Sequence, residues 1–359
     1  MNSPNKPSSI PAEEILAAIK GIISDFGLKL IGVCPADSYP LQDGLYQKWL
    51  DKGNAGSMDF MRQHAPLKYH PQAVLPECKS LIFVALNYFQ APPDLNADQG
   101  IVARYAWGRD YHKVLGKKLL ACRRALEAKF PNHQWRNFTD TCPIDERWYA
   151  EKAGISFTGR NHLAISQEFG SWFVMGEILS TLELPTSGAA SPKTIGVCPS
   201  GCKRCIDVCP TGALKTNGSI DVSQCIAYLT IEHKGPFPIE LRKAMGQHLF
   251  GCDKCQEVCP HNLRATDTSE PDFLRWKAGP AINLAELLGM NEADFLERFA
   301  GGPLMRAGYK LMLRNALNAA GNSKNPELIP AISAFIAHAD PLLAEQAVWA
   351  LNQLQSPNI

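Results

Sequence analysis

The chain has 359 residues, which at roughly 150 residues per domain suggests two or three domains. Hydrophobic residues make up 45% of the sequence and charged residues 20%, and 36 basic against 35 acidic side chains leave a net charge of +1. This balance excludes a polycation that coats nucleic acid by bulk charge, although a local basic surface is compatible with it. The longest apolar run, 81–86, has only the length of a strand, and the N-terminus lacks a basic-then-apolar signal, so we expect a cytoplasmic protein.

The first 185 residues predict a mixture of helices and strands without regular βαβ alternation. Helices are expected over three segments, 11–26, 110–130 and 143–153. Gly27 and Gly154 directly follow two of these segments, as is typical of helix C-termini. Runs rich in Ile, Val, Leu and Phe predict strands at 29–33, 81–88, 135–138, 163–166 and 172–179, the last two joined by a turn.

The second half divides into a linker, a cysteine-rich block and a helical region. Small residues and prolines at 184–193 are typical of a linker. After about Arg264 the sequence predicts helices to its end, with three clear segments at 309–320, 327–337 and 342–354. A faint similarity between 313–321 and 345–353 suggests stacked helical repeats.

Eight of the twelve cysteines lie between Cys198 and Cys259, which in a reducing cytosol indicates metal ligands rather than disulfides. Their spacing follows the bacterial ferredoxin run C-x2-C-x2-C-x3-C-P, in which the fourth cysteine ligates the other 4Fe–4S cluster. The first gap here is x3 instead of x2, which one bulged residue would accommodate. By this logic one cluster takes Cys198, Cys202, Cys205 and Cys259, and the other takes Cys209, Cys225, Cys252 and Cys255.

Two structural zinc sites, each held by four cysteines, are the alternative interpretation of the same block. A Cys-Pro after an x3 step in both halves favours iron–sulfur clusters over zinc ribbons. The remaining four cysteines are scattered and are expected in the core: Cys34, Cys78, Cys122 and Cys142.

A series of local phrases outside the cysteine block carries a resemblance to a known family. They are GSMDFM at 56–61, ARYAWGRDYHKVL at 103–115, TDTCPIDERWYAEKAG at 139–154, FTGRNHLAI at 157–165, IAYLTIEHKG at 226–235 and FGCDKCQEVCPHN at 250–262. In this order, and together with the cysteine runs, they closely resemble epoxyqueuosine reductase over residues 10–320.

The resemblance implies an α+β fold in three parts. These are a cobalamin-binding catalytic α/β domain (1–190) akin to nitroreductases and reductive dehalogenases, a ferredoxin-type domain with two 4Fe–4S clusters (191–265), and an α-helical, HEAT-like C-terminal region (266–359). It also implies the activity: cobalamin reduced through the clusters converts epoxyqueuosine to queuosine at the tRNA wobble position. An external electron donor of flavodoxin or ferredoxin type is the second implied partner.

The resemblance assigns the proton donor of this reaction to Asp140. A simpler interpretation is that Asp140 caps the helix expected near Pro143. If Asp140 is the donor, we expect burial beside cobalamin and base to raise the pKa of its carboxyl, as an acid at neutral pH requires.

Further contacts to cobalamin are implied around Gly159-Arg160-Asn161, where the family commonly has Gly-Lys-Asn or Gly-Lys-His. Arginine keeps the charge of lysine but changes the geometry of its donors. The candidate cobalamin-binding residues are Arg62, Arg104, Tyr105, Thr158, Arg160, Asn161 and His162.

Two basic helices are candidates for the tRNA contact. Lys113, Lys117 and Arg124 crowd the helix expected at 110–130. Arg306, Lys310 and Arg314 recur every four residues and would share one helix face; we favour this second stripe. Two other functions stay open: a cytoplasmic relative of reductive dehalogenases that acts on a small organohalide, and a ferredoxin-type electron carrier.

Overall fold

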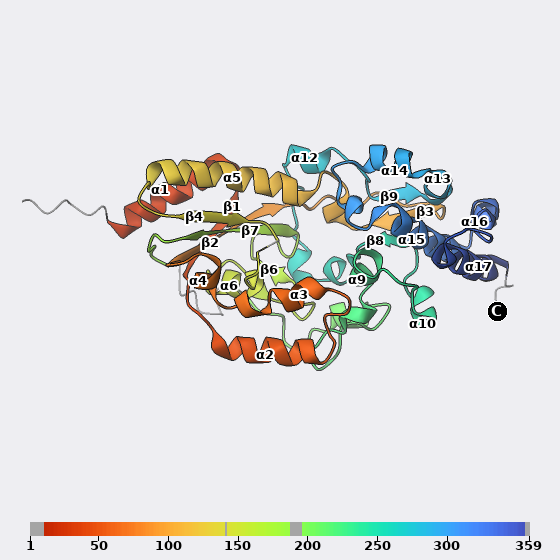
Figure 1. Cartoon of the computed structure of the whole chain (residues 1–359), viewed down its shortest axis with the longest axis horizontal. Coiled ribbons are helices and arrows are strands. Elements are labelled where there is room, and N and C mark those ends of the chain that lie inside the picture. Colours follow the sequence, from red (N-terminus) through yellow and green to blue (C-terminus); the bar gives the residue numbers. More distant parts are fainter. Residues whose placement is uncertain (1–10, 141, 187–195, 356–359) are drawn as a thin grey trace, which may run out of the picture.

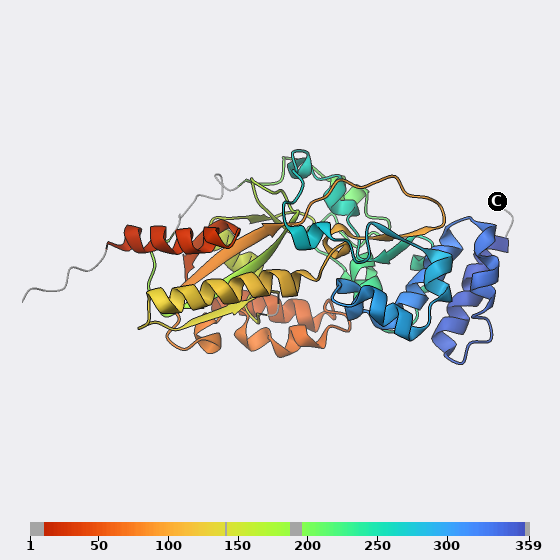
Figure 2. The same cartoon turned by 90° about the horizontal axis from the view of Figure 1, so that it is seen from above.

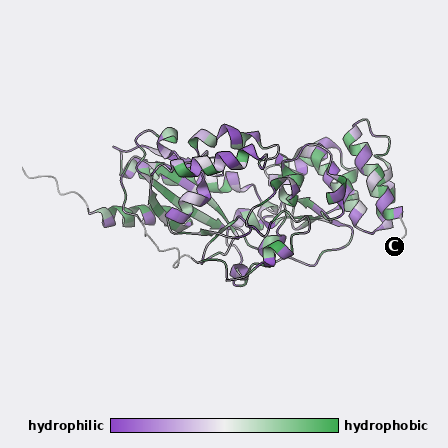
Figure 3. Ribbon diagram, turned by 90° about the horizontal axis from the view of Figure 1, so that it is seen from below, coloured by the Kyte–Doolittle hydropathy of each residue, from purple (hydrophilic) through white to green (hydrophobic). Residues whose placement is uncertain are grey.

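The computed structural model describes residues 11–140, 142–186 and 196–355. Its first half is built on an antiparallel four-stranded sheet in the order β1–β2–β7–β4, with bounds Lys29–Pro35, Ser80–Asn87, Phe173–Ser180 and Trp135–Phe138. β2 and β7 pair without a register shift along their whole length. The sheet is hydrophobic in Figure 3, whereas the helices around it alternate in hydropathy.

Helices cover both faces of this sheet (Figures 1 and 2). Ile82 and Val84 pack toward α1 (Ala12–Asp25) and α5 (Tyr111–Lys129), whereas Leu81 and Phe83 pack toward the other face. The two-residue alternation of a strand thus supplies both cores. Helices on the second side are α2 (Pro40–Asp51), α3 (Asp59–Gln63), α4 (Pro71–Val74) and α6 (Glu146–Lys152), with the 3-10 turn η1 (Ala65–Leu67).

Most of the expected elements of this half are present. The strand at 135–138 has the expected bounds, and Gly27 and Gly154 have positive φ after their helices. The helix expected at 143–153 begins only at Glu146, because the Asp145 carboxylate caps it by accepting from the backbone N–H of Trp148. Both strands expected at 163–166 and 172–179 are present, as β6 (Ala164–Ile165) and β7, but they lie in different sheets because β6 pairs with β5 (Phe157–Thr158).

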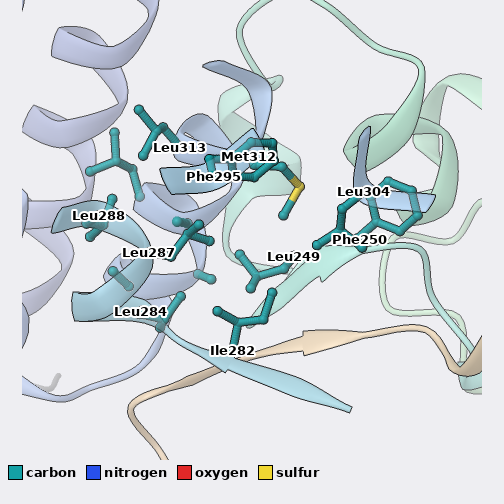
Figure 4. Packing of buried hydrophobic residues seen from close by; sticks show 14 of the residues in the cluster. Leu249, Phe250, Ile282, Leu284, Leu287, Leu288, Phe295, Leu304, Met312 and Leu313 are labelled. Carbon is teal, nitrogen blue, oxygen red and sulfur yellow. The ribbon is translucent and has the colours of Figure 1, made fainter. Parts of the chain in front are cut away.

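A second sheet, of three short strands, joins distant parts of the sequence. Its order is β8–β3–β9, with bounds His248–Phe250, Gln99–Val102 and Ala281–Asn283. The expectation that the chain is wholly helical after Arg264 is therefore wrong, because β9 completes this sheet. Figure 4 shows the apolar cluster beside it, in which Leu249 and Ile282 meet Met312.

The cysteine-bearing segment is composed of short turns and helices. They are α8 (Arg204–Asp207), η3 (Val222–Gln224), α9 (Ile226–Ile231), α10 (Ile239–Arg242), α11 (Lys254–Glu257) and η4 (Pro260–Asn262). Most of the expected linker at 184–193 falls in 187–195, outside the described residues, while Leu184 itself is buried in the core. The four scattered cysteines are buried, as expected.

The C-terminal part is mainly helical. Its elements are α12 (Pro271–Leu274), α13 (Leu284–Gly289), α14 (Glu292–Phe299), η5 (Pro303–Arg306), α15 (Gly308–Asn322), η6 (Pro326–Leu328), α16 (Ile329–Ser333) and α17 (Pro341–Gln355). The helix expected at 327–337 is thus a 3-10 turn followed by a shorter α-helix. α15 approaches α17 so closely that a Cβ on Gly321 would lie 2.8 Å from Ala350 Cα. Among the described helices, none has the length and apolar character needed to cross a membrane.

Candidate functional site

The eight clustered cysteines fall into two sets that line two different cavities. Cys198, Cys202, Cys205 and Cys259 line a small pocket of about 310 Å³, open solvent at its mouth included. Cys209, Cys225, Cys252 and Cys255 lie together in the wall of a larger cleft. These are the two sets derived from the ferredoxin spacing. Across the described residues, no three His, Cys, Asp or Glu side chains converge tightly enough to hold a single metal ion.

Two short helices, α8 and α11, pack against each other and carry one cysteine of each set. Burial raises the pKa of the Cys252 thiol to about 12, and repulsion from Cys225 and Cys209 adds to this effect. Four such thiols can become thiolates together only if a positive group offsets their charge. The donor set therefore fits an iron–sulfur cluster.

A large cleft separates the four-stranded sheet from the second cysteine set. It has two adjoining parts of about 1760 and 2020 Å³, open solvent at the mouth included, which share Met58, Met61, Tyr88 and Tyr105 in their walls. The cysteine-bearing segment is held against the first half beside this cleft, where Ser57 N donates to Tyr228 Oη at 2.9 Å. Aromatic and sulfur-bearing side chains thus share the walls with charged ones such as Lys68 and Arg147, which suits a large, flat ligand that is partly apolar and partly polar.

Asp140 lies at the end of the cleft away from these cysteines. It follows β4 with a left-handed φ of 56°, and its carboxylate is held by the Tyr111 hydroxyl and by His112 Nε2 at 3.3 Å. The opposite ring nitrogen of His112 bonds to Asp110, the N-cap of α5, at 2.8 Å. Asp145, not Asp140, caps α6, so the interpretation of Asp140 as a helix cap is wrong. The Asp140 side chain lines the cleft instead.

The charge state of this group also differs from the expectation. The Asp140 side chain is 54% exposed, and its partial desolvation is outweighed by hydrogen bonds from His112 and Tyr111, which lower the pKa of its carboxyl. Bonds to Asp110 and Asp140 likewise outweigh burial and raise the pKa of His112 to about 9. In this state the transferable proton therefore resides on His112, between two carboxylates.

Three of the seven candidate cobalamin-binding residues line the cleft: Tyr105, Asn161 and His162. Within the described structure, the buried Nδ2 of Asn161 and Nε2 of His162 have no hydrogen-bond partner. Burial and the charge of Arg147 lower the pKa of His162, so its ring is neutral at pH 7. Unpaired buried polar atoms of this kind call for a ligand.

The other four lie elsewhere. Arg104 is buried under Trp172 and forms ion pairs with Asp253 and Glu257, because a buried guanidinium needs carboxylate partners. Arg62 is exposed and donates to the Leu50 carbonyl. Neither lines the cleft, and their assignment to cobalamin stays a prediction. Thr158 and Arg160 line a side cavity of about 850 Å³ outside the cleft.

Arg160 is associated with the first cysteine set. Its backbone N–H lies 3.4 Å from Cys198 Sγ, and its guanidinium bonds to the Cys202 carbonyl. The β5–β6 hairpin thus presents Arg160 to one cysteine set while Asn161 reaches the cleft as well. The structure thus shows Arg160 in contact with this cysteine loop, and its contact with cobalamin stays a prediction.

The favoured C-terminal basic stripe does not form. Arg306 belongs to η5, lines the cleft and pairs with Glu232, while Lys310 pairs with Asp340 at 2.7 Å. Arg314 is 0% exposed and donates to three backbone carbonyls, which fixes the segment after α9. Helical spacing predicted one exposed face for the three residues. In the structure Arg306 precedes α15, and Arg314 lies on its buried face.

Sequence reasoning missed Tyr111 and His112 as functional groups, although both lie in the quoted phrase ARYAWGRDYHKVL. The signal available was Asp110 two residues before His112, an N-cap pattern that holds a histidine at the start of a helix. It also missed that Arg306 reaches the same cleft, which no local pattern in the sequence indicates.

Comparison with known proteins shows the family of the chain. Residues 68–141 match the family described as "Epoxyqueuosine reductase QueG, DUF1730", and residues 198–262 match the "4Fe-4S double cluster binding domain". The epoxyqueuosine reductase of Vibrio cholerae is 35% identical over 95% of this chain and 92% of its own length. That of Escherichia coli K12 is 37% identical over 92% of this chain and 86% of its own length. The chain belongs to the epoxyqueuosine reductase family.

Solved structures of this family have the same fold. An epoxyqueuosine reductase solved with an epoxyqueuosine-modified tRNA-Tyr stem loop superposes with a TM-score of 0.86 at 27% identity, over 96% of this chain and 91% of that one. The enzyme from Bacillus subtilis, solved with an aspartate catalytic loop swung out of its active site, gives 0.84 over 96% and 92% of the two chains. The mixed helix–sheet fold and the double-cluster segment are therefore those of oxidoreductases of this family.

Proposed function

We propose that this protein reduces epoxyqueuosine to queuosine at the wobble position of tRNA, using cobalamin and two 4Fe–4S clusters. The carrying observation is the single cleft with four cysteines at one end and Asp140 with His112 at the other. Electrons and protons would thus reach a substrate in the same space from opposite sides. A relative solved with an epoxyqueuosine-modified stem loop supports tRNA as the substrate.

In this proposal the two cysteine sets hold the clusters, the one in the cleft wall lying nearer the substrate. We keep the proposed division into a catalytic domain, a ferredoxin-type domain and a HEAT-like region at residues 190 and 265. An external flavodoxin- or ferredoxin-type donor would supply the electrons. Since tRNA is found in the cytoplasm, the expectation of a cytoplasmic enzyme is kept.

Cobalamin fits the part of the cleft between the cysteines and Asp140. Tyr88 and Tyr105 offer aromatic surface, and Asn161 Nδ2 and His162 Nε2 offer unpaired polar atoms toward it. When bound, cobalamin would supply the low-potential electron pair that breaks the C–O bonds of the epoxide. The protein would orient it and exclude water.

Proton delivery is assigned to Asp140 and His112. A base that fills the cleft excludes water, which raises the pKa of the Asp140 carboxyl and draws the shared proton from His112 Nε2. Asp140 would then pass this proton to the departing epoxide oxygen, and Asp110 would keep the His112 ring in orientation for the transfer. Arg306 lines the same end of the cleft and adds positive charge close to this pair.

The surface left for the phosphates of tRNA is that of α5. Lys113, Lys117 and Arg124 are exposed along this helix, which begins at His112's end of the cleft. Such contacts would add affinity without base specificity, while the wobble base is splayed into the cleft.

The decisive experiment is nucleoside analysis of tRNA from a strain that lacks this gene. Accumulated epoxyqueuosine, reversed by the parent gene and not by a gene encoding Asp140→Asn, is the expected result. Normal queuosine in the deletion strain would overturn the proposal.

A further inference from the structure

A pair of buried carboxyl groups lies behind Asp140 at the wall of the cleft. Glu177 is in the middle of β7, 0% exposed, between Phe83 of β2 and Phe138 of β4. Glu146 begins α6 and lines the cleft together with Asp140. The two carboxyls come from different elements and meet at the interface of the sheet and α6.

No N–H or hydroxyl in the described part of the chain donates to either oxygen of Glu177 or to Oε1 of Glu146. The Glu146 carboxyl and the Cys142 thiol are the neighbouring side chains that influence the ionisation of the Glu177 carboxyl most directly. Two carboxyls can bond to each other only when at least one carries a proton. Ionising a buried carboxyl that receives no hydrogen bond is costly, so this environment favours a pair that keeps a proton.

The surrounding charges favour the same state. Burial and the charge of Asp140 raise the pKa of both carboxyls. Glu177 raises the pKa of Glu146 further, whereas the interaction with Glu146 lowers that of Glu177, so the proton of the pair belongs mainly to Glu146. The charge of Lys68 acts in the opposite direction and lowers the pKa of Glu146. Tyr111 is also close enough for the Glu146 charge to raise the pKa of its hydroxyl. A pair with these neighbours keeps a proton at neutral pH.

We propose that the Glu146–Glu177 pair is the store of the second proton used in epoxide reduction. Expelling an epoxide oxygen as water consumes two protons with two electrons, and the Asp140–His112 pair holds one. After Asp140 has given its proton to the oxygen, the O–H bond of Glu146 breaks and its proton passes to the Asp140 carboxylate. Solvent at the cleft mouth restores the proton of the pair. The inference rests on the proposed function, which supplies the electrons.

Infrared spectroscopy of the ligand-free, full-length protein tests the pair independently of activity. A neutral carboxylic acid has a C=O stretch above the amide I band that shifts in heavy water. We expect this band in the parent protein at pH 7 and its loss in Glu177→Gln and in Glu146→Gln. Glu168→Gln, an exposed residue that pairs with Lys29, is the matched control and should retain it.

Single-turnover reduction of epoxyqueuosine-modified tRNA tests the role. In Glu146→Gln we expect a loss of about 100-fold, within the range of general acid–base catalysis, with cobalamin and iron content unchanged. The parent rate should fall as the pH rises through the pKa of the pair, and this limb should be absent in Glu146→Gln. The same limb should be absent in Glu177→Gln, provided that variant folds.

The outcomes separate the two proposals. If the parent protein lacks the infrared band, the Glu146–Glu177 pair holds no proton at pH 7, and the inference is refuted whatever the activity. A band with an unchanged rate and pH profile in Glu146→Gln shows a structural pair and also overturns the inference. Failure of the parent itself to reduce epoxyqueuosine contradicts the proposed function, and leaves the infrared result as the test of the pair's proton.

Discussion

Replacing Arg314 by Ala should destabilise the protein strongly, although its spacing with Lys310 suggests a solvated surface charge. The guanidinium donates to the carbonyls of Leu229, His233 and Gly235 at 2.7–2.9 Å and lies 4.0 Å from the ring centre of Phe237. A hydrogen bond from a charged donor contributes about 1.5–3 kcal/mol, and water entering the space left would recover part of the loss. We therefore expect a loss of about 4 kcal/mol in the free energy of unfolding.

Urea unfolding followed by tryptophan fluorescence measures this loss, and hydrogen exchange localises it. Amides at 229–237 should exchange faster in the variant, because Arg314 fixes the carbonyls of this segment. Lys310→Ala on the same helix is the control; its side chain is 56% exposed and its unfolding should stay close to the parent's. An Arg314→Ala protein as stable as the parent but weaker in tRNA binding would refute this reasoning and restore the basic stripe.

Three further predictions concern the site. Asp140→Asn should abolish epoxide reduction with iron content unchanged, and substantial turnover would contradict its role. By NMR, His112 should titrate near pH 9 in the parent and nearer its ordinary 6.5 in Asp140→Asn. Because folding raises the pKa of His112, its bonds to the two carboxylates stabilise the folded protein fully below about pH 6.5. This stabilisation is lost progressively as the pH rises through 9. Cys225→Ser should remove one cluster by iron analysis and electron paramagnetic resonance, and loss of both or neither would contradict the partition. Replacing the exposed α5 residues Lys113, Lys117 and Arg124 by Ala should weaken tRNA binding and flatten the dependence of the binding constant on salt concentration. An unchanged salt dependence would contradict this prediction.

Part of the candidate site could be predicted from the sequence because its chemistry is encoded in local spacing. The two cysteine runs specify loops that wrap a cluster, and the same two sets of four cysteines line separate cavities in the structure. The β5–β6 hairpin residues Asn161 and His162 were likewise recognisable from a short phrase. The resemblance to the family also indicated Asp140 as a site residue. It did not indicate the side chains that surround Asp140.

The long-range parts of the site were not predictable in this way. The pKa of Asp140 depends on His112, held 28 residues earlier at the start of α5, and on Arg306 from a distant turn. Arg104 lies in one of the phrases shared with the family, but its guanidinium forms ion pairs with Asp253 and Glu257. A local pattern carries no information on such partners, because electrostatic energies depend on distances in space rather than along the chain.

The sequence by itself determined helices α1 and α5, the four strands of the larger sheet, the cysteine sets and the family to which the chain belongs. These depend on periodicity, helix-ending glycines and ligand spacing, all of which act over a few residues. Only the tertiary structure decided that 99–102, 248–250 and 281–283 form one sheet, that Arg314 is buried, and that Glu146 meets Glu177. The reason is that burial and pairing are collective: a side chain becomes core, ligand or proton store according to which distant segments pack against it.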